Sequence, residues 1–277
     1  MAMPGLHDVR LKAAALLTAA EGQPDGWLSA EAASSRPAVD PPSASDYWLH
    51  RLLQLSTQVP SLNLVNAWSA DYPPNLRTVK GRPAILFVDG QLTDADRRAI
   101  AIVGSREGTA MALELTRSIA QELGERGLTV VSGLARGIDS AAHEGALTGG
   151  GRTVAVMGTG TGVIFPPENA ALSDRIRNHG ALISQFPPGF GPTKTSFPAR
   201  NAVIAGMSLG SLIITANERS GTRIEINCTL AQGRPVLLWR GLLESERWAH
   251  QLALDPLVRF VDSVEEIIGA VGPDIAR

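Results

Sequence analysis

The chain has 277 residues, of which 44% are hydrophobic and 19% are charged, and its net charge is −2. This composition is typical of a globular protein, and the length suits one large domain with a small addition or two small domains. A net charge near zero excludes a uniformly polybasic nucleic-acid-binding protein, so the cations of any nucleic-acid site must be gathered in one patch.

The single cysteine, Cys228, excludes an internal disulfide and argues against a zinc site. Because Cys228 lies in an apolar helical pattern, we expect a buried structural thiol rather than a nucleophile. No apolar run reaches the ~18 residues that a membrane helix needs, and the first residues lack the pattern of a signal peptide. We therefore expect a cytoplasmic protein with no membrane segment, no metal and no cofactor.

Residues 1–68 are predicted to form a small helical region with a linker. Residues 11–20 have apolar helical spacing, residues 30–45 are rich in Ala, Ser and Pro, and residues 46–68 have leucines on one helical side. The two prolines at 73 and 74 then predict a turn, since no helix interior accommodates them. A short strand is expected at 84–88.

From residue 99 onward, apolar runs alternate with segments of helical spacing. The runs lie at 99–103, 128–131, 153–157, 181–184, 210–214 and 235–239. Runs without alternation of polar and apolar residues indicate strands buried on both faces, and their alternation with helices predicts a mostly parallel sheet. Residues 257–270 are expected to add one more strand and helix, so residues 69–277 are predicted to be one α/β domain.

Ligands of an open parallel sheet bind beyond the carboxyl ends of its strands, so the residues that follow each run are the candidates for binding. Gly104, Ser105 and Arg106 follow the first run. Gly104 permits a sharp turn, Ser105 and the next amides can donate to an anion, and Arg106 can hold a phosphate by two hydrogen bonds. An ordinary turn with a solvated arginine is the alternative.

The second run is followed by a long loop of small residues that contains Gly133, Arg136 and Asp139. We expect this loop to belong to the binding site. Arg136 and Asp139 are also candidates for an ion pair that holds the loop, and Asp139 or Ser140 is expected to cap the next helix. His143, one turn further on, is expected to be a packed residue.

Gly158 and Gly160 follow the third run, where the loop is rich in Gly and Thr and allows a ligand to approach the backbone closely. Glu168, after two prolines, suits the first turn of a helix. Lys194, Phe197, Arg200 and Asn201 then precede or begin another helix. The cations can neutralise phosphates, whereas Phe197 either stacks on a base or anchors the loop in the core.

Ser220, Gly221 and Thr222 lie at the start of a helix after the fifth run, where free amides and two hydroxyls can bind an anion. Glu225 either bonds a ribose hydroxyl or lies on the helix surface. Gly-rich or hydroxyl-rich turns thus follow five predicted strands at one edge of the sheet. This arrangement indicates an extended, phosphate-rich ligand.

These segments, taken together and in this order, resemble the DprA/Smf family of bacterial DNA-processing proteins. The matching segments are Tyr72–Leu76, Ile102–Arg106, Ser132–His143, Thr153–Gly160, Phe165–Asn169 and Phe197–Asn201, within residues 70–240. The resemblance implies an extended Rossmann-like, doubly wound domain that binds single-stranded DNA without catalysis. It also implies a homodimer and delivery of the strand to the recombinase RecA during natural transformation and DNA recombination.

Residues that match the family's DNA-contacting positions are Arg106, Lys194, Phe197, Arg200 and Asn201, while Gly133, Arg136 and Asp139 match its pocket loop. The chain also departs from the family. Ala202 stands where a second arginine is usual, and the C-terminal winged-helix domain common in the family is not expected.

Residues 220–225 form a Gly-Thr-x-x-Glu segment similar to the cytokinin-activating phosphoribohydrolases known as lonely guy proteins, in which it holds a nucleoside monophosphate. The alternative function is therefore a nucleotide-sensing or nucleoside-monophosphate-hydrolysing relative, with a role in phage defence.

Overall fold

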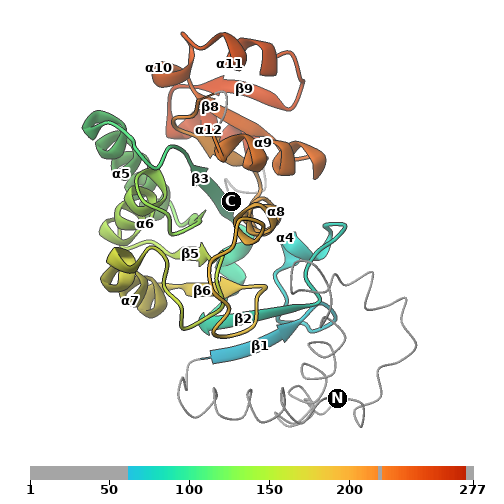
Figure 1. Cartoon of the computed structure of the whole chain (residues 1–277). Helices are drawn as coiled ribbons and strands as arrows, with labels where there is room; N and C mark the ends of the chain where they lie inside the picture. Colours follow the sequence, from blue (N-terminus) through green and yellow to red (C-terminus); the bar gives the residue numbers. More distant parts are fainter. Residues whose placement is uncertain (1–61, 218–219, 273–277) are drawn as a thin grey trace, which may run out of the picture.

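The computed structural model describes residues 62–217 and 220–272. Its centre is a nine-stranded sheet with the strand order β1-β2-β6-β5-β4-β3-β7-β8-β9 (Figure 1). The strands are β1 (Leu62–Asn66), β2 (Ile85–Gly90), β3 (Ala99–Val103), β4 (Thr129–Ser132), β5 (Thr153–Val156), β6 (Ala181–Ser184), β7 (Ser211–Ile213), β8 (Val236–Trp239) and β9 (Val258–Val261).

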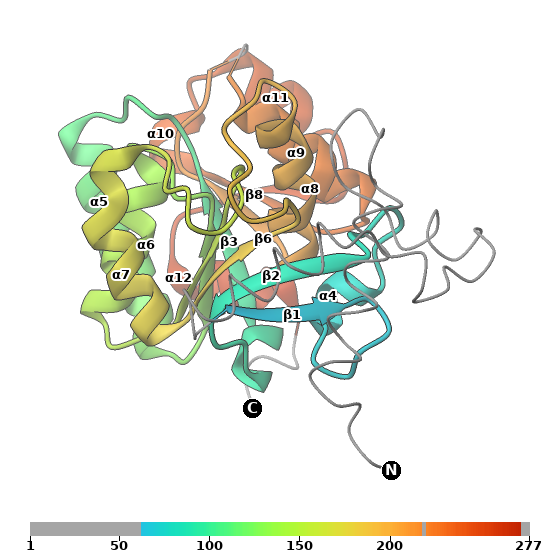
Figure 2. The ribbon, with the colours of Figure 1, turned by 60° about the horizontal axis from the view of Figure 1, so that its bottom comes forward.

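The strands from β6 to β9 in this order are parallel, whereas β2 pairs with β6, and β1 with β2, in antiparallel orientation. Figure 2 shows this antiparallel pair beside β6. The predicted doubly wound, mostly parallel α/β fold is thus confirmed, including the last strand and helix. On one side of β3 the sheet continues with β4, β5 and β6, and on the other side with β7, β8 and β9. Open α/β sheets bind ligands at such a switch point in the strand order.

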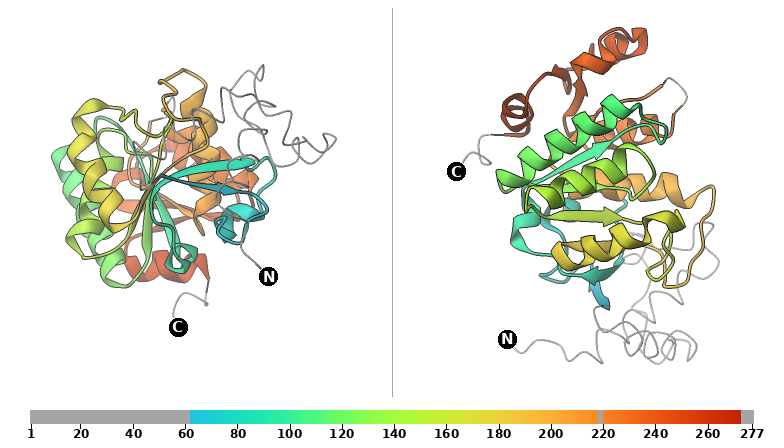
Figure 3. Two further views of the ribbon diagram at one scale, coloured as in Figure 1. Left: turned by 90° about the horizontal axis from the view of Figure 1, so that it is seen from below. Right: turned by 90° about the vertical axis from the view of Figure 1, so that its left-hand side faces the viewer.

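Helices cover both faces of the sheet. They are α4 (Pro74–Arg77), α5 (Ala110–Glu125), α6 (Ile138–Thr148), α7 (Ala170–His179), α8 (Ser196–Met207), α9 (Thr222–Ala231), α10 (Arg240–Leu243), α11 (Arg247–Leu252) and α12 (Val264–Val271), with short 3₁₀ turns at Asp94–Arg97 and Pro167–Asn169. The left view of Figure 3 has α5, α6 and α7 on one side of the sheet and α8 and α9 on the other.

Buried hydrophobic residues form a core on each face of the sheet, and successive residues of a strand pack into opposite cores. In β3, Ala99, Ala101 and Val103 pack with the α8 and α9 side, whereas Ile100 and Ile102 pack with α5, α6 and α12. All five residues are buried, because each face of the strand meets a helical layer. This double burial explains why the strand has no polar alternation. None of the helices in the described part of the chain has both the length and the hydropathy that a membrane crossing requires.

The helix expected over residues 46–68 is wrong for residues 62–66. Residues 62–66 form strand β1, not the end of a helix, and they pair with β2 from Leu62 opposite Asp89 to Asn66 opposite Ile85. Residues 62–66 form a strand because they pair with β2. The spacing of Leu62, Leu64 and Val65 in the sequence does not reveal this pairing. The rest of the predicted N-terminal region, residues 1–61, lies outside the described residues.

Helices α5 and α6 approach so closely that glycine is required between them. A Cβ at Gly145 of α6 would lie 2.3 Å from the Arg117 carbonyl oxygen of α5, and one at Gly149 would lie 2.5 Å from the Gln121 carbonyl oxygen. Both neighbouring atoms belong to helix backbone and cannot move independently. The close packing of α5 on α6 holds the loops at the carboxyl edge of β3 and β4 in register.

We predict that Gly145→Ala lowers the free energy of unfolding by about 1–3 kcal/mol, because the methyl group forces the two helices apart. Gly269→Ala is the matched control, since Gly269 lies in α12 with open space around its Cα. There the same substitution should raise the free energy of unfolding by roughly 0.5–1 kcal/mol through helix propensity. Urea denaturation measures both changes, and equal effects in the two helices would contradict the packing argument.

Candidate phosphate-binding pocket

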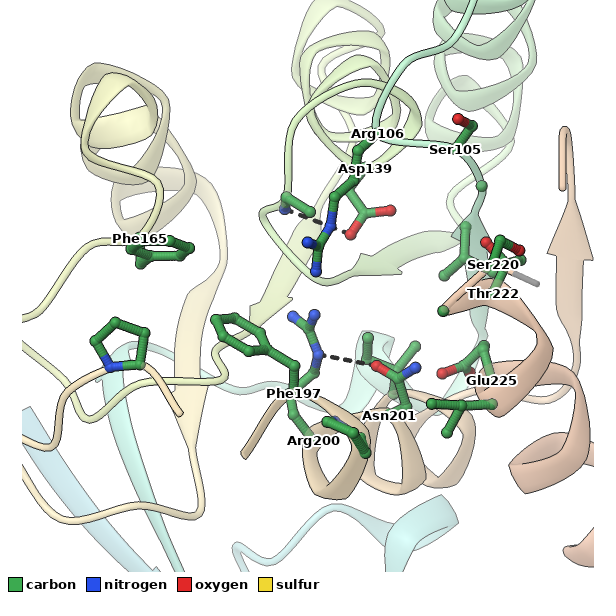
Figure 4. Close-up of a pocket in the computed structure, with 18 of the residues that line it drawn as sticks. Ser105, Arg106, Asp139, Phe165, Phe197, Arg200, Asn201, Ser220, Thr222 and Glu225 are labelled. Carbon is green, nitrogen blue, oxygen red and sulfur yellow. Dashed lines mark hydrogen bonds between the residues drawn. The ribbon is translucent and has the colours of Figure 1, made fainter. Parts of the chain in front are cut away.

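A pocket of about 700 Å³ opens at the carboxyl edge of the parallel strands. Figure 4 shows its walls, which come from the turn after β3, the start of α6, the loop before α8, α8 itself and the start of α9. The residues of the predicted site that line it are Gly104, Ser105, Arg106, Asp139, Lys194, Phe197, Arg200, Asn201, Ser220, Gly221, Thr222 and Glu225. Turns that are far apart in the sequence therefore meet at one place, as expected for parallel strands.

Arg200, in the first half of α8, lies beneath the pocket with its guanidinium buried. Its Nη1 donates to the carbonyl oxygens of Gly133 at 2.5 Å and Val156 at 2.6 Å, and its Nε donates to Asn201 Oδ1 at 3.1 Å. The side chain is 4% exposed, and burial lowers the pKa of Arg200 although the charge of Asp139 opposes this shift. Arg200 thus binds mainly to the protein itself and also lines the pocket, so its contact with DNA stays a prediction.

Asp139 is the buried acidic partner of this charge. Its Oδ2 accepts hydrogen bonds from the amides of Gly133 at 3.2 Å and Ala135 at 3.4 Å. Burial raises the pKa of Asp139, and the nearby Arg200 charge together with these amides works in the opposite direction. Asp139 therefore closes the loop after β4 over Arg200.

The predicted cap of α6 is wrong. The N-cap residue is Gly137, with φ 75° and no side-chain cap hydrogen bond, and Ser140 Oγ donates instead to the Ala135 carbonyl oxygen. A Cβ at Gly137 would lie 2.4 Å from the Ser105 carbonyl oxygen, so only glycine allows the two turns to touch. The contact brings the turn after β3 against the start of α6, which leaves Asp139 free to bind the loop amides.

Three of the predicted glycines do not line the pocket, and two of them, Gly133 and Gly158, make room for residues that do. A Cβ at Gly133 would lie 2.3 Å from Arg200 Nη1, and one at Gly158 would lie 2.5 Å from Phe197 Cδ1. A Cβ at Gly160 would lie 1.9 Å from the Pro187 carbonyl oxygen. Close approach of a ligand was predicted for Gly158 and Gly160, and the structure shows that the protein's own Phe197 and Pro187 lie close to them.

Arg136 also lies outside the pocket lining, and the predicted ion pair with Asp139 is wrong. Its Nε pairs with Glu168 Oε1 of the turn before α7, and its side chain is 65% exposed. The hydrogen bond from Arg136 lowers the pKa of Glu168. This surface pair joins the loops after β4 and β5 and contributes little to stability.

The cations free to meet a ligand are at the rim. Arg106 and Lys194 are both exposed and line the pocket from opposite loops. Within residues 62–217 and 220–272, neither has a carboxylate within ion-pair distance. The Ser105 amide donates to Thr215 Oγ1 at 3.2 Å, so the positive charge of this turn comes mainly from Arg106.

An aromatic surface adjoins these cations. Phe197 is half-buried, and its ring centroid lies 5.7 Å from that of Phe165, which is 42% exposed. The guanidinium carbons of Arg106 and Arg200 each lie 5.8 Å from the Phe197 centroid. Phe197 is thus both anchored and available to a planar ligand. Phe165 was not among the predicted site residues, although an aromatic residue before two prolines was a sequence signal for a site residue.

Glu225 of α9 lies at the opposite end of the pocket and is 1% exposed. Burial raises the pKa of Glu225 to about 8, although the Arg200 charge lowers it. Its Oε1 accepts from Ser211 Oγ at 3.4 Å, while Oε2 and the Ser220 hydroxyl have no hydrogen-bond partner among the described residues. The helix-surface alternative for Glu225 is therefore excluded, and a protonated carboxyl faces the pocket at neutral pH.

Two titratable residues outside the pocket are structural. His143 is buried with Nδ1 2.6 Å from Thr153 Oγ1, and burial lowers its pKa to about 3, so it is neutral. Burial raises the pKa of Cys228 to about 11, which excludes a reactive thiolate at neutral pH. The prediction of a packed His143 is confirmed, whereas Cys228 is half-buried and not fully buried as expected. In the described ranges, no group of three or more His, Cys, Asp or Glu side chains could hold a metal ion.

The buried Glu225 predicts that stability falls as the pH rises from about 4.5 to about 8. The carboxyl ionises near pKa 4.5 in the unfolded chain but near 8 in the folded one, so the folded state binds more protons between these values. Its contribution is complete below 4.5 and is lost as the pH passes 8. Urea denaturation at pH 5 and pH 9 should show the unfolding free energy of Glu225→Gln, relative to that of the wild type, rising by up to about 4 kcal/mol from the lower to the higher pH.

Glu114→Gln is the control for this measurement, because the Glu114 side chain is 78% exposed. Its unfolding free energy should follow the wild type at both pH values. Parallel curves for Glu225→Gln and the wild type would contradict a protonated Glu225.

Comparison with known proteins agrees with this geometry. Residues 63–270 match the family model described as DNA recombination-mediator protein A. Protein Smf of Escherichia coli (strain K12) is 39% identical over 183 residues, which are 66% of this chain and 49% of that protein. DprA of Streptococcus pneumoniae (strain ATCC BAA-255 / R6) is 41% identical over 165 residues, which are 60% of this chain and 58% of that protein. The chain thus spans about half of the length of these relatives.

Solved structures show the same fold. The X-ray structure of DprA from Streptococcus pneumoniae has a TM-score of 0.74 and 29% identity, and the match covers 97% of this chain and 98% of that one. DprA from Helicobacter pylori has a TM-score of 0.66 and 24% identity, over 76% of this chain and 95% of that one. Since the family model covers most of the residues of this chain, the protein belongs to the DNA recombination-mediator protein A family, that is, DprA/Smf.

Proposed function

We propose that the pocket binds single-stranded DNA and that the protein acts without catalysis. The observation that supports this most is the juxtaposition of Arg106 and Lys194, which have no ion-pair partner among the described residues, with the half-buried ring of Phe197. Cations that bind phosphates beside an aromatic ring that stacks on bases are the usual means of binding a single strand. A net charge of −2 is compatible with this function because two exposed cations lie at the same pocket.

The pocket suits a strand better than a duplex. Its aromatic end, Phe197 with Phe165, requires an unstacked base, and a paired base does not present its face. The buried Arg200 and Asp139 form the floor of the pocket, and the exposed cations Arg106 and Lys194 lie at its rim.

The relatives support this assignment and suggest its context. The Helicobacter pylori neighbour is described as a DNA processing protein with a single-stranded DNA binding mode. By its family, this protein would form a homodimer, pass the strand to the recombinase RecA and act in natural transformation in the cytoplasm. The homodimer, the transfer to RecA and the role in transformation are inferred from the family membership.

A second candidate function is the binding of a single nucleotide, with a role in phage defence. It is favoured by the unpartnered Glu225 Oε2 and Ser220 hydroxyl. Hydrolysis of a nucleoside monophosphate is less favoured, since Arg223 does not line the pocket and its Cζ lies 4.9 Å from the Trp248 ring centroid.

We predict that Arg106→Ala with Lys194→Ala weakens binding of a 20-nucleotide strand about tenfold or more at low salt. The double variant should also reduce the slope of log K against log salt by between about 1 and 2, because two phosphate contacts are lost. Fluorescence anisotropy over a salt series measures both quantities. Arg97→Ala with Lys80→Ala is the matched control, since both side chains are exposed and lie outside the pocket. Equal losses in the two double variants would contradict a local phosphate site.

Phe197→Ala should weaken binding of the same strand by about 1–3 kcal/mol with little change in the salt slope, because stacking is lost and no charge is removed. Phe260→Ala is the matched control. Phe260 is also half-buried and has the Arg240 guanidinium 5.3 Å from its ring centroid, but it lies on β9 outside the pocket. Unchanged affinity for Phe197→Ala would mean that Phe197 serves only to anchor the loop.

A further inference from the structure

The end of the pocket at the start of α9 has polar atoms that the described protein residues do not use. Glu225 Oε2 and Ser220 Oγ are both shielded from solvent and have no hydrogen-bond partner in residues 62–217 and 220–272. Figure 4 shows the Glu225 carboxyl directed toward the space beside Asn201, with Ser220 and Thr222 on the same side of the pocket. Buried polar groups without partners cost free energy, so their presence at a pocket wall indicates a ligand.

The charges around this end favour a neutral group. From the neighbouring elements, Arg200 of α8 and Asp139 of α6 act on Glu225 with opposite signs, and the uncharged Ser211 of β7 donates to its Oε1. Because burial raises the pKa of Glu225 to about 8, the carboxyl has no charge with which to attract a cation. Once ionised, it would repel a phosphate.

A neutral carboxyl and a serine hydroxyl can each donate one hydrogen bond and accept others. A hydroxyl, which likewise donates and accepts, complements both of these groups. Phosphate oxygens accept only, and their favourable position is at the rim cations Arg106 and Lys194, at the open side of the pocket.

We infer that Glu225 and Ser220 form a subsite for a free sugar hydroxyl of a nucleotide whose phosphate lies at the rim cations. This inference rests on the proposed function, since it concerns the same pocket. An internal deoxynucleotide has no free sugar hydroxyl, because both of its sugar oxygens are esterified. The subsite therefore selects either the 3′ end of a DNA strand or a ribonucleotide, which share this chemistry.

The test compares three oligothymidylates of equal length with a 5′ fluorophore. One ends in a 3′-hydroxyl, one ends in a 3′-deoxy sugar, and one has the same 3′-deoxy end and a single ribonucleotide inside. We expect the wild type to bind a hydroxyl-bearing strand roughly 3- to 10-fold more tightly than the 3′-deoxy strand, as for one or two hydrogen bonds. The second and third strands distinguish a ribose hydroxyl from a strand end.

Variants then assign the preference to the subsite. Glu225→Met keeps the volume but no hydrogen-bonding group and should bring the ratio of affinities to about one, and Ser220→Ala should reduce it. Glu225→Gln, which still donates and accepts, should retain the preference. Asn227→Ala is the control, because Asn227 is exposed on the same helix outside the pocket. Thermal unfolding of each variant checks that the protein is folded.

Each outcome bears on the inference. Equal affinities of the wild type for all three strands, or a preference that persists in Glu225→Met, would overturn it while leaving strand binding intact. A Glu225→Met effect that follows the identity of the bases, in a parallel series of adenine and cytosine strands, would also overturn it, because the carboxyl would then contact a base edge. No binding of any strand would remove the proposed function and this inference together.

Discussion

The guanidinium of Arg200 is buried at the point where β4 and β5 end, and the arrangement of the pocket depends on it. It donates to the carbonyl oxygens of Gly133, which directly follows β4, and of Val156, the last residue of β5. Asp139 supplies the opposite charge and holds the loop amides above it. A buried charge without such a partner is strongly destabilising, so these residues form one unit in which each group requires the others.

This unit determines what remains for a ligand. Since the charge of Arg200 is used within the protein, the positive charge available at the surface comes from Arg106 and Lys194 at the rim. Phe197 lies between the guanidiniums of Arg106 and Arg200, where Gly158 leaves space for its ring. The opposite end is neutral and polar because burial keeps the Glu225 carboxyl protonated. The pocket therefore has an aromatic and cationic side for bases and phosphates and a neutral side for a different group.

The amino-acid sequence by itself determined the sheet from β3 onward and the edge that binds. Strands buried on both faces have continuous apolar runs, and the helices between them have their own period, so both patterns are local and could be recognised. Parallel strands joined by helices place every following turn at one edge, which predicted that Arg106, Phe197 and Glu225 would meet. The packed His143 and the inert Cys228 were also predictable, because each lies in an apolar helical pattern.

Only the tertiary structure decided which partner each polar residue has. Arg136 bonds to Glu168 and not to Asp139, and the guanidinium of Arg200 binds backbone carbonyl oxygens at the base of the pocket, because residues remote in sequence supply the partners. Strand β1 likewise exists because β2 offers its edge to residues 62–66. The spacing of residues along a segment indicates its secondary structure. Hydrogen bonds, burial and pKa values depend on neighbours that only the folded chain brings together.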